Sequence, residues 1–434
     1  MSPSYVGIDF GTTNSAFAVA GERGDVRLAS FPRREGGPTD TFRSILYFDP
    51  DERDARNMLK PWVGPEAIEN YLEGLGEGRL IQSLKSFLAS RLFTATSVFQ
   101  RQYSLEDLAS LILSGLAAGA RGQLAGVGAC VVAGRPVRFS NAESEEDNEF
   151  ALGRLRAAFE KAGFERVVFE YEPVAAAYYY ESRLDRDELV LIADFGGGTS
   201  DFSLMRVGPG LRGVAAERRI LGTEGVALAG DAFDSRIVDH VVAPRLGLGT
   251  QYRSYMDGKI MTVPNWLYSR LRRWHHLSFL KSRETMKLLE EIEAQSLAPE
   301  SIAGLIHLVE HDLGYHLYKA VEATKVALSK SERTEFVFRD APIDIRAEVA
   351  RADFEAWIAE ELQQITTCVD RLLERTRVPI GDVDRVFMTG GSSFVPAVRR
   401  IFADRFGAER LRGGQEMTSV ALGLALRARD LGLA

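Results

Sequence analysis

The chain has 434 residues, 45% of them apolar, and its 61 acidic and 53 basic side chains give a net charge of −8. A chain of this length is expected to divide into two lobes rather than enlarge a single core. Its negative charge disfavours binding to nucleic acid or to anionic lipids. The start of the sequence lacks a secretory signal, and no uninterrupted apolar stretch is long enough to cross a membrane. Together these features predict a cytoplasmic protein that binds neither nucleic acid nor membrane.

Strands and helices alternate along the first half of the chain. A strand-turn-strand pattern precedes residues 21–105, which are rich in charge and predicted to be irregular. The periodicity then predicts helices at 105–124, 143–162 and 173–182 and strands at 128–133 and 166–171. This alternation favours a layered α/β sheet in each lobe.

The second half is richer in helix. Helices are predicted at 230–242 and 320–329, with a strongly charged helical insertion between them. The last predicted elements are a strand at 385–388, a turn at 389–393 and helices at 395–406 and 419–431. The chain thus closes with another strand-turn-helix unit.

One short pattern occurs twice. The segments VGIDFGTTNSAFA (6–18) and IADFGGGTSDFS (192–203) share an apolar strand, Asp-Phe-Gly, a turn of small residues and a second alternating strand. Strands of period two on either side of such a turn predict a β-hairpin in each copy. Agreement over about a dozen positions argues against a chance repeat.

The repeated turns have the chemistry of a phosphate site. Backbone N–H groups in a glycine-rich turn converge on an anion, and the aspartate before each turn can hold magnesium through water. Two such turns facing each other would hold the phosphates of a nucleotide from both sides. A P-loop is excluded because Gly258 and Lys259 are followed by Ile260. A protein kinase is excluded because the sequence has no His-Arg-Asp.

Six segments occur in an order typical of one family. They are VGIDFGTTNS (6–15), YEPVAAAYYY (171–180), LIADFGGGTSDFS (191–203), LAGDAFDSRIVD (228–239), EATKVALS (322–329) and FMTGGSSFVPAV (387–398). In this order they resemble the ATPase domain of DnaK-type heat-shock chaperones, which belongs to the superfamily of actin and hexokinase. The resemblance covers essentially the whole chain and is nearest to truncated, YegD-type relatives of DnaK.

The resemblance implies an α/β, actin-like ATPase fold with duplicated halves of ribonuclease H type around a nucleotide cleft. The first lobe would cover residues 1–186, with an insertion at 36–104. The second would cover residues 187–434, with a helical insertion at 226–312. ATP or ADP with magnesium would bind between the repeated hairpins.

The resemblance also implies roles at the phosphates. Asp9 and Asp194 would hold magnesium and act in catalysis, and Lys85 would lie near the γ-phosphate. Glu172 would orient the attacking water with Asp194, and the Thr199 hydroxyl would face the γ-phosphate. Such roles suit hydrolysis, which requires positioned water and neutralised charge. The other implied cofactor-binding residues of these segments are Gly11, Thr12, Thr13, Asn14, Gly196, Gly197, Gly198, Asp201, Gly230 and Asp231.

Nucleoside recognition departs from the family pattern. The two arginines that sandwich adenine in typical members correspond to Val326 and Phe394, and a later acidic position falls near Met417. Phe394 would stack on a purine, with Val326 packed against it. This departure leaves tight ATP binding and strict preference for adenine open. The implied nucleoside residues are Glu322, Lys325, Ser329, Gly390, Gly391, Ser392 and Phe394.

The function implied by the resemblance is a DnaK-like switch that binds and hydrolyses ATP. Only three residues follow the last predicted helix, so the usual peptide-binding domain is not expected, and contacts with a client or co-chaperone are expected in the insertion at 247–312. Two alternatives share the fold. One is an actin-like filament protein, and the other is a small-molecule kinase.

Some features have simpler interpretations. Lys85 also fits a surface lysine, and Glu172 suits a helix start by its charge alone. The segment HLVEH (307–311) matches a zinc-peptidase pattern, but it has no evident third ligand and five residues match easily by chance. The basic, aromatic segment 266–283 is better explained by an amphipathic helix with a solvated basic face than by a binding surface.

Overall fold

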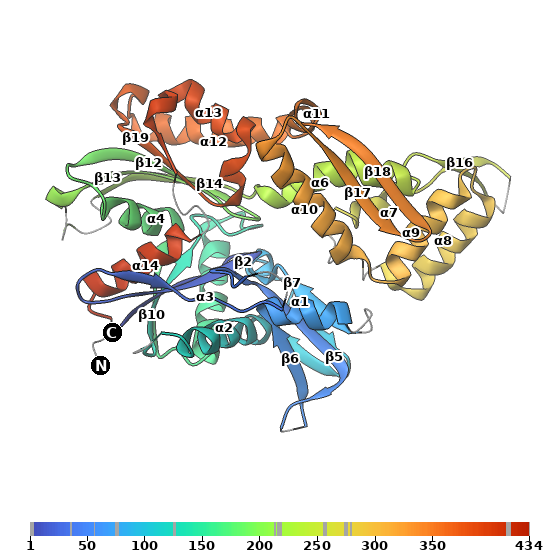
Figure 1. Cartoon of the computed structure of the whole chain (residues 1–434), viewed down its shortest axis with the longest axis horizontal. Coiled ribbons are helices and arrows are strands. Elements are labelled where there is room, and N and C mark those ends of the chain that lie inside the picture. The colour runs from blue at the N-terminus through green and yellow to red at the C-terminus, as the bar shows by residue number, and fades with distance from the viewer. Residues whose placement is uncertain are drawn as a thin grey trace. The chain divides into compact units, whose positions relative to one another are not determined.

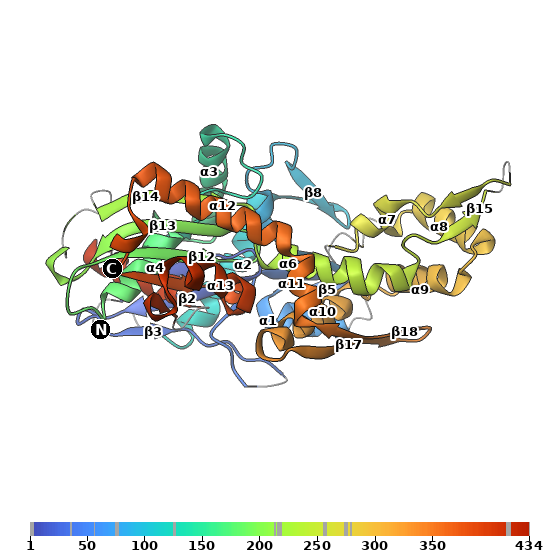
Figure 2. The ribbon, with the colours of Figure 1, turned by 90° about the horizontal axis from the view of Figure 1, so that it is seen from above.

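The computed structural model describes residues 4–34, 37–55, 57–73, 78–124, 127–211, 214, 219–254, 258–272, 277, 280–413 and 418–433. The chain is mixed α/β, as predicted. It divides into two compact units, Met1–Gly230 with Gln363–Ala434 and Asp231–Leu362. Figures 1 and 2 show the elements of both units. The lobe boundaries implied by the resemblance stay a prediction.

A six-stranded sheet of the first unit contains the first repeated hairpin. β1 (Tyr5–Asp9) and β2 (Asn14–Ala20) pair antiparallel, which confirms the hairpin prediction. On its other side β1 pairs parallel with β10, which pairs parallel with β11. The other strands are β3 (Val26–Leu28), β4 (Phe42–Arg43), β10 (Cys130–Arg135) and β11 (Arg166–Tyr171).

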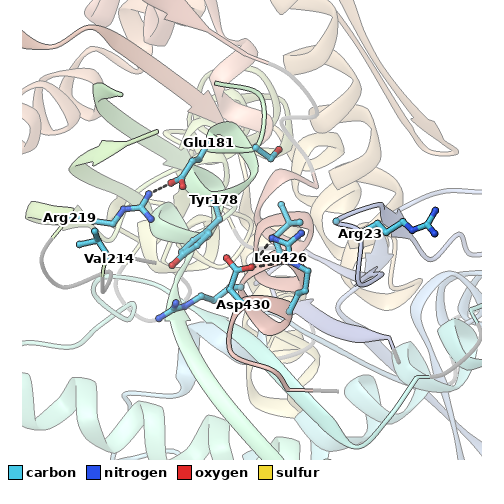
Figure 3. A pocket seen from close by; sticks show the side chains of 11 residues that line it. Arg23, Tyr178, Glu181, Val214, Arg219, Leu426 and Asp430 are labelled. Carbon is cyan, nitrogen blue, oxygen red and sulfur yellow. Dashed lines mark hydrogen bonds and ion pairs between the residues drawn. The ribbon is translucent and has the colours of Figure 1, made fainter. Parts of the chain in front are cut away.

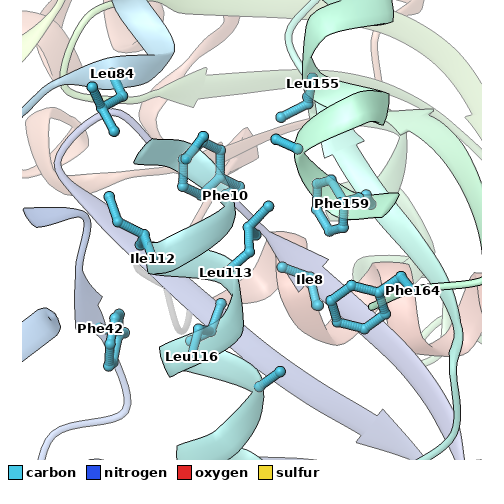
Figure 4. Packing of buried hydrophobic residues seen from close by; sticks show 14 of the residues in the cluster. Ile8, Phe10, Phe42, Leu84, Ile112, Leu113, Leu116, Leu155, Phe159 and Phe164 are labelled. Atoms are coloured by element: carbon cyan, nitrogen blue, oxygen red, sulfur yellow. The ribbon is translucent and has the colours of Figure 1, made fainter. Parts of the chain in front are cut away.

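Two helices, α2 (Leu105–Arg121) and α3 (Glu145–Lys161), also belong to the first unit. Each begins with a capping box, in which a serine and an aspartate three residues later satisfy each other's backbone N–H groups. Apolar side chains of α2 and α3 form one core with those of β1 and β2 (Figure 4). Its fully buried members include Ile8, Phe10, Ile112, Leu113, Leu116, Leu155 and Phe159.

A five-stranded sheet of the same unit contains the second repeated hairpin. β12 (Glu188–Phe195) and β13 (Ser200–Val207) pair antiparallel, and β12 pairs parallel with β19 (Arg385–Thr389). All eight residues of β12 are buried, which accounts for its nearly unbroken apolar sequence. The remaining elements are β14 (Ile220–Val226), β20 (Leu411–Arg412), α12 (Ala359–Thr376), α13 (Pro396–Phe406), η2 (Pro209–Leu211), η6 (Ile380–Asp382), η7 (Gly391–Phe394) and η8 (Ala408–Arg410).

Two helices, α4 (Glu172–Glu181) and α14 (Ser419–Asp430), lie between these two sheets (Figure 1). α14 packs on β1 and β2, α4 packs on β12 and β13, and the two helices pack on each other. Small residues permit this close approach. A Cβ added to Gly7 would lie 2.2 Å from Ala425 N, and one added to Gly423 would lie 1.7 Å from Ala175 O. The two hairpins are therefore held by one tightly packed core.

The prediction that residues 21–105 are irregular was wrong. Charged side chains obscured the strand periodicity there, because only the first half of β5, Ile45 to Phe48, is buried. β5 forms a three-stranded sheet with β6 and β7, and β8 pairs with β9. Besides β3 and β4, the elements of this region are β5 (Ile45–Arg53), β6 (Leu59–Val63), α1 (Gly64–Glu73), β7 (Arg79–Gln82), η1 (Leu84–Phe87), β8 (Ala95–Val98) and β9 (Arg101–Ser104).

The second unit contains the charged insertion, which is helical in part and also holds the hairpin of β15 and β16. A second hairpin, β17 with β18, was not predicted, although Phe336, Phe338, Ile343 and Ile345 alternate as its buried face. No helix within the described ranges is both long and apolar enough to span a membrane. The elements are α6 (Gly230–Ile237), η3 (Val238–Val242), η4 (Ala243–Leu246), β15 (Gln251–Arg253), β16 (Ile260–Thr262), α7 (Asn265–Ser269), α8 (Arg283–Gln295), α9 (Pro299–Glu310), α10 (Gly314–Lys330), β17 (Arg333–Asp340), β18 (Ile343–Ala350) and α11 (Arg351–Trp357).

The contact between α4 and α14 predicts a sensitive position. Because the atom nearest to a Cβ on Gly423 is a backbone oxygen, Gly423→Ala is expected to lower the free energy of unfolding by about 3 kcal/mol. Urea unfolding measures the change. The matched control is Gly153→Ala in α3, where no atom lies within 4 Å of the added carbon. This control should raise stability by up to about 1 kcal/mol. Wild-type stability in Gly423→Ala would contradict the close packing.

Candidate functional site

The turn of the first hairpin is fixed by hydrogen bonds to a neighbouring strand segment. The Ser44 hydroxyl donates to Gly11 O over 2.7 Å, and Ser44 N donates to Thr13 O over 3.0 Å. Arg43 Nη1 donates to Asn14 Oδ1 over 3.2 Å. A Cβ on Gly11 would lie 2.0 Å from Asn14 O, so this turn requires glycine at that position. The loop between Asp9 and Asn14 therefore has a defined shape.

The turn of the second hairpin is closed by a hydrogen bond from Gly196 N to Thr199 O over 2.9 Å. Asp201 is held just beyond it, since Val137 N donates to Asp201 Oδ1 over 3.0 Å and the Thr199 hydroxyl also donates to this carboxylate. These bonds leave Gly197 and Gly198 at the tip of the turn.

The two turns face each other. A Cβ built on Gly198 would lie 3.6 Å from the Oγ1 atom of Thr12, which is in the turn of the first hairpin. The hydroxyls of Ser86 and Ser140 lie 3.6 and 3.5 Å from the same point. Backbone N–H groups and three hydroxyls thus gather at one place, as oxyanion binding requires. The structure brings the predicted residues of both repeats together.

Ser86 and Ser140 were missed by the sequence analysis. Ser86 follows Lys85 in η1, and Ser140 lies in the loop after the parallel strand β10. Ligands of open α/β sheets bind outside the carboxyl ends of parallel strands, so the loop after β10 was a detectable signal. Nothing in the residue type of Ser86 distinguished it from other serines.

Lys85 and Glu172 form a buried ion pair beside the turns. Lys85 Nζ lies 2.5 Å from Glu172 Oε1, and the two residues are only 7% and 6% exposed. Lys85 is therefore no ordinary surface lysine. Glu172 begins α4, and a Cβ on Gly134 of β10 would lie 3.1 Å from its Cγ. This glycine leaves the space that the glutamate side chain occupies.

Carboxylates outnumber cations here. Burial, followed by the charge of Glu172, raises the pKa of Asp9 to about 7 and the pKa of Asp201 to about 7. The same two causes raise the pKa of Asp194 well above its usual value. Burial alone would lower the pKa of Lys85, but Glu172 and Asp9 outweigh it and the pKa is raised. The lysine stays charged, while the excess negative charge disfavours full ionisation of the aspartates.

This donor set fits magnesium. Asp9 ends β1 and Asp194 lies near the end of β12, so each carboxylate is held by a strand next to its turn. Magnesium prefers oxygen ligands, binds through one or two carboxylates and keeps several waters. A divalent cation would also offset the electrostatic repulsion that raises the pKa of both aspartates.

Three of the seven predicted nucleoside residues belong to the second unit. Glu322, Lys325 and Ser329 lie on α10, and Lys325 Nζ is paired with Asp234 Oδ2 of α6 at 2.8 Å. Asp231 also belongs to this unit, in α6. The part of the prediction that refers to Met417 lies outside the described residues.

The predicted turn at Gly390 belongs to the first unit. Gly390 has a φ of +81°, and a Cβ there would lie 2.0 Å from Phe195 O, so the position requires glycine. Gly391 to Phe394 form η7 directly after β19, at the same edge of the sheet as the second hairpin turn. Ser392 is buried, whereas Phe394 is 45% exposed. Gly230 N lies 3.5 Å from Gly196 O, next to that turn.

The two remaining sequence features have structural roles. His307 Nε2 is bonded to Asp340 Oδ1 at 2.7 Å, and its ring lies against that of His311. No group of three or more His, Cys, Asp or Glu residues within the described ranges is arranged to hold a metal ion. In the basic segment, Arg272 pairs with Asp239, while Arg273, Trp274 and Phe279 lie outside the described residues.

Comparison with known proteins identifies the family. The family model described as Hsp70 protein matches residues 89–246 and 310–431. The chain belongs to the Hsp70 family. Its relatives include the chaperone protein DnaK of Thermosipho africanus, which is 24% identical over 98% of this chain and 59% of its own length. DnaK of Deinococcus proteolyticus is 26% identical over 98% of this chain and 58% of its own length.

The Hsp70 family is a family of chaperone-type ATPases. The chain spans about three fifths of the length of the DnaK relatives that it matches. The activities and partners of those longer proteins therefore enter only as proposals for this chain.

The raised pKa of Asp201 predicts a pH-dependent stability. Aspartate titrates near 3.8 in the unfolded chain and at about 7 in the fold, so between these values the folded state binds more protons. The free energy of unfolding of the ligand-free protein should therefore fall as the pH rises from about 4 to about 7. Asp201→Asn should flatten this profile and stabilise the protein above that range by a few kcal/mol, since one pKa unit corresponds to about 1.4 kcal/mol.

Urea unfolding without divalent cations, repeated from about pH 4 to about pH 8, measures this profile. The control is Asp404→Asn, an exposed position on α13. It should leave the slope unchanged. Parallel profiles for wild type and Asp201→Asn would show that Asp201 does not bind the extra proton of the folded state.

Proposed function

We propose that the chain is an ATP-binding and ATP-hydrolysing switch of the Hsp70 type, built on an actin-like ATPase fold. The observation that carries the proposal is the approach of Gly198 to Thr12, Ser86 and Ser140 beside the buried pair of Lys85 and Glu172. Two glycine turns with backbone donors, three hydroxyls and an ammonium group supply hydrogen-bond donors for the oxygens of a triphosphate. A nucleotide that contacts both turns would favour states in which they lie close together.

In this proposal the phosphates accept hydrogen bonds from both turns. The N–H groups of Thr12 and Thr13 would bind one side, and those of Gly196 to Gly198 the other. The Thr13 and Thr199 hydroxyls would reach the γ-phosphate. A Cβ on Gly198 would lie at ordinary contact distance from three hydroxyls, so phosphate oxygens placed near it would meet hydrogen-bond donors.

Asp9 and Asp194 would hold magnesium through its water ligands. Bound there, magnesium supplies charge neutralisation for phosphoryl transfer. A bound cation would stabilise the ionised form of both carboxylates, which burial and mutual repulsion otherwise disfavour. Because Asp9 and Asp194 lie on separate hairpins, a cation held by both would keep the two turns close together.

Glu172 and Lys85 would act on the attacking water and on the developing charge. In the ligand-free protein one Glu172 oxygen is bonded to Lys85. An approaching γ-phosphate offers Lys85 a second anion, which would free that carboxylate oxygen to accept a hydrogen bond from water. Hydrolysis needs this positioning more than covalent assistance.

Phe394 would support the nucleobase. It lies at the end of the turn after β19, on the sheet edge where β12 also ends, and almost half of its surface is exposed. An aromatic ring stacks on any base, whereas hydrogen-bonding side chains discriminate among bases. The preference for adenine would therefore be weak on this side of the base.

Partner contacts through the insertion at 247–312 stay a prediction. Four exposed apolar side chains of this insertion are available for such contacts. These side chains are Ile260, Met261, Trp266 and Leu297. Client binding itself is proposed only by analogy with the DnaK relatives.

Removing the charge of Asp194 should weaken magnesium-dependent nucleotide binding. Isothermal titration of wild type and Asp194→Asn with ATP, ADP and GTP, each with and without magnesium, measures this effect. We expect wild type to bind all three with magnesium. Asp194→Asn should bind about 10- to 100-fold more weakly, because the cation loses a ligand and losses of this size are typical of altered metal sites. Asp404→Asn is the control for a charge lost elsewhere in the first unit. Equal binding by wild type and Asp194→Asn would refute the site.

Glu172→Gln should separate binding from hydrolysis. The amide keeps the shape of the side chain but accepts a proton from water poorly, so kcat should fall by about 10²- to 10⁴-fold. The dissociation constant for ATP should change little. Single-turnover hydrolysis with titration of ATP measures both quantities. If kcat is unchanged, Glu172 does not orient the water.

A further inference from the structure

A separate cavity lies within the first unit, at the far ends of α4 and α14 (Figure 3). Its volume is about 590 Å³, within the range of about 300–1,000 Å³ typical of small-molecule sites. Glu172 begins α4 in the phosphate site, whereas Tyr178 and Glu181 line the cavity. At 1.5 Å of rise per residue, the two ends of this helix are about 13 Å apart. The cavity is therefore distinct from the proposed nucleotide site.

The lining of the cavity is rich in arginine. Among the described residues, its charged members are four arginines and two acids, namely Arg23, Arg219, Arg427, Arg429, Glu181 and Asp430. Both acids are already neutralised, because Glu181 pairs with Arg219, and Asp430 Oδ1 lies 2.7 Å from Arg429 Nη2. Arg427 pairs through Nε with Glu170 at 3.2 Å, and Arg23 makes no ion pair with any described residue. The lining thus carries more positive charge than its acids balance.

Tyr178 adds an unused donor to this cavity. The residue is only 8% exposed, yet its hydroxyl has no hydrogen-bond partner among the described residues. Its ring lies near two guanidinium groups, with Arg219 Cζ 5.5 Å and Arg427 Cζ 5.3 Å from the ring centroid. Figure 3 shows Tyr178 between the pair of Arg219 with Glu181 and the side chain of Asp430. Burial raises the pKa of Tyr178, so the phenol keeps its proton and can donate it.

The two guanidinium groups that flank Tyr178 repel each other. Arg219 is 3% exposed, and burial followed by the charge of Arg427 lowers its pKa. This repulsion persists although Arg219 pairs with Glu181 and Arg427 with Glu170. An anion in the cavity would accept hydrogen bonds from the hydroxyl and the free guanidinium edges while reducing this repulsion.

The walls of the cavity are fixed by close backbone contacts. α4 and α14 approach at Gly423 and Ala175, as described above. The turn between β2 and β3 is held against Arg429, because a Cβ on Gly24 would lie 2.3 Å from Arg429 Nη1 and Gly24 has a φ of +85°. The contact between α4 and α14 holds the helices that carry Tyr178 and Arg427, which lowers the entropic cost of binding a ligand there.

We propose that this cavity binds a small oxyanion, a phosphate- or carboxylate-bearing solute, through Tyr178 Oη and the guanidinium groups of Arg219 and Arg427, with Arg23 adding positive charge to the lining. This site is additional to the proposed nucleotide site and does not depend on it.

The test uses the full chain without magnesium or nucleotide, at an ionic strength held constant with sodium chloride. Inorganic phosphate and succinate are titrated separately, with thermal shift and calorimetry as readouts. At least one probe is expected to bind wild type and raise its melting temperature. Tyr178→Phe keeps the ring and removes the hydroxyl, and it should weaken binding about tenfold. Arg23→Gln, at an exposed position outside any described ion pair, should also weaken it.

Thr12→Val distinguishes this cavity from the hairpin turns. Binding that is retained in Thr12→Val and weakened in both Tyr178→Phe and Arg23→Gln supports the proposal, and the tighter probe identifies phosphate or carboxylate as the preferred group. The proposal is overturned if neither probe binds wild type, or if binding is lost in Thr12→Val and kept in the two cavity variants. Circular dichroism of each variant at the titration temperature verifies that it is folded.

Discussion

The crowding of Asp9, Glu172, Asp194 and Asp201 around a single buried ammonium group is the constraint on which the candidate site depends. One lysine cannot neutralise four carboxylates, and burial makes every uncompensated charge expensive. A ligand-free protein accommodates this cluster by keeping protons that aspartates usually release. Binding of a cation together with a polyanion would relieve the repulsion among the carboxylates in another way, because it would add a positive and a negative charge to the site at once. When no ligand is bound, the site therefore lowers the stability of the protein, as is common for binding sites.

Packing between the two sheets makes this crowding possible. Alanine and glycine on β1, β2, α4 and α14 let the two helices fit between two sheets whose hairpin turns then lie close together. Bulkier residues would separate the turns and weaken the electrostatic coupling among the carboxylates. The aromatic core around α2 supports one sheet from its other side. The geometry of the proposed phosphate site therefore depends on small side chains in the core that are not part of the site itself.

The hairpins were predictable because their signal is local. Alternating apolar residues, an aspartate and a glycine turn specify a hairpin within a dozen positions, and duplication doubled the evidence. Helices with capping serines, such as α2 and α3, were predictable for the same reason. Residues 21–105 were not, because β5 is buried over only half of its length and its charged half resembles a loop. Ser86 and Ser140 join the site through tertiary contacts that no local pattern records.

The assignment of each element to one of the two units could not be read from local pattern alone. α10 has clear helical spacing, but its place in the second unit also depends on the ion pair with α6, 91 residues earlier in the chain. The cavity beside Tyr178 was likewise invisible in sequence, since its arginines come from three separate segments. Each arginine looks like an ordinary surface residue until the fold gathers them.

The position of α14 against β1 has a consequence for biogenesis. Gly7 touches the backbone of a helix that begins at Ser419, so the first strand meets a principal neighbour only after nearly the whole chain has been made. Contacts of such high sequence separation slow folding and leave partly built cores exposed. A nascent form of this protein would carry an open alanine-lined groove until that late segment arrives. Assistance from other chaperones would matter most during this interval, which makes a member of a chaperone family a candidate for help during its own synthesis.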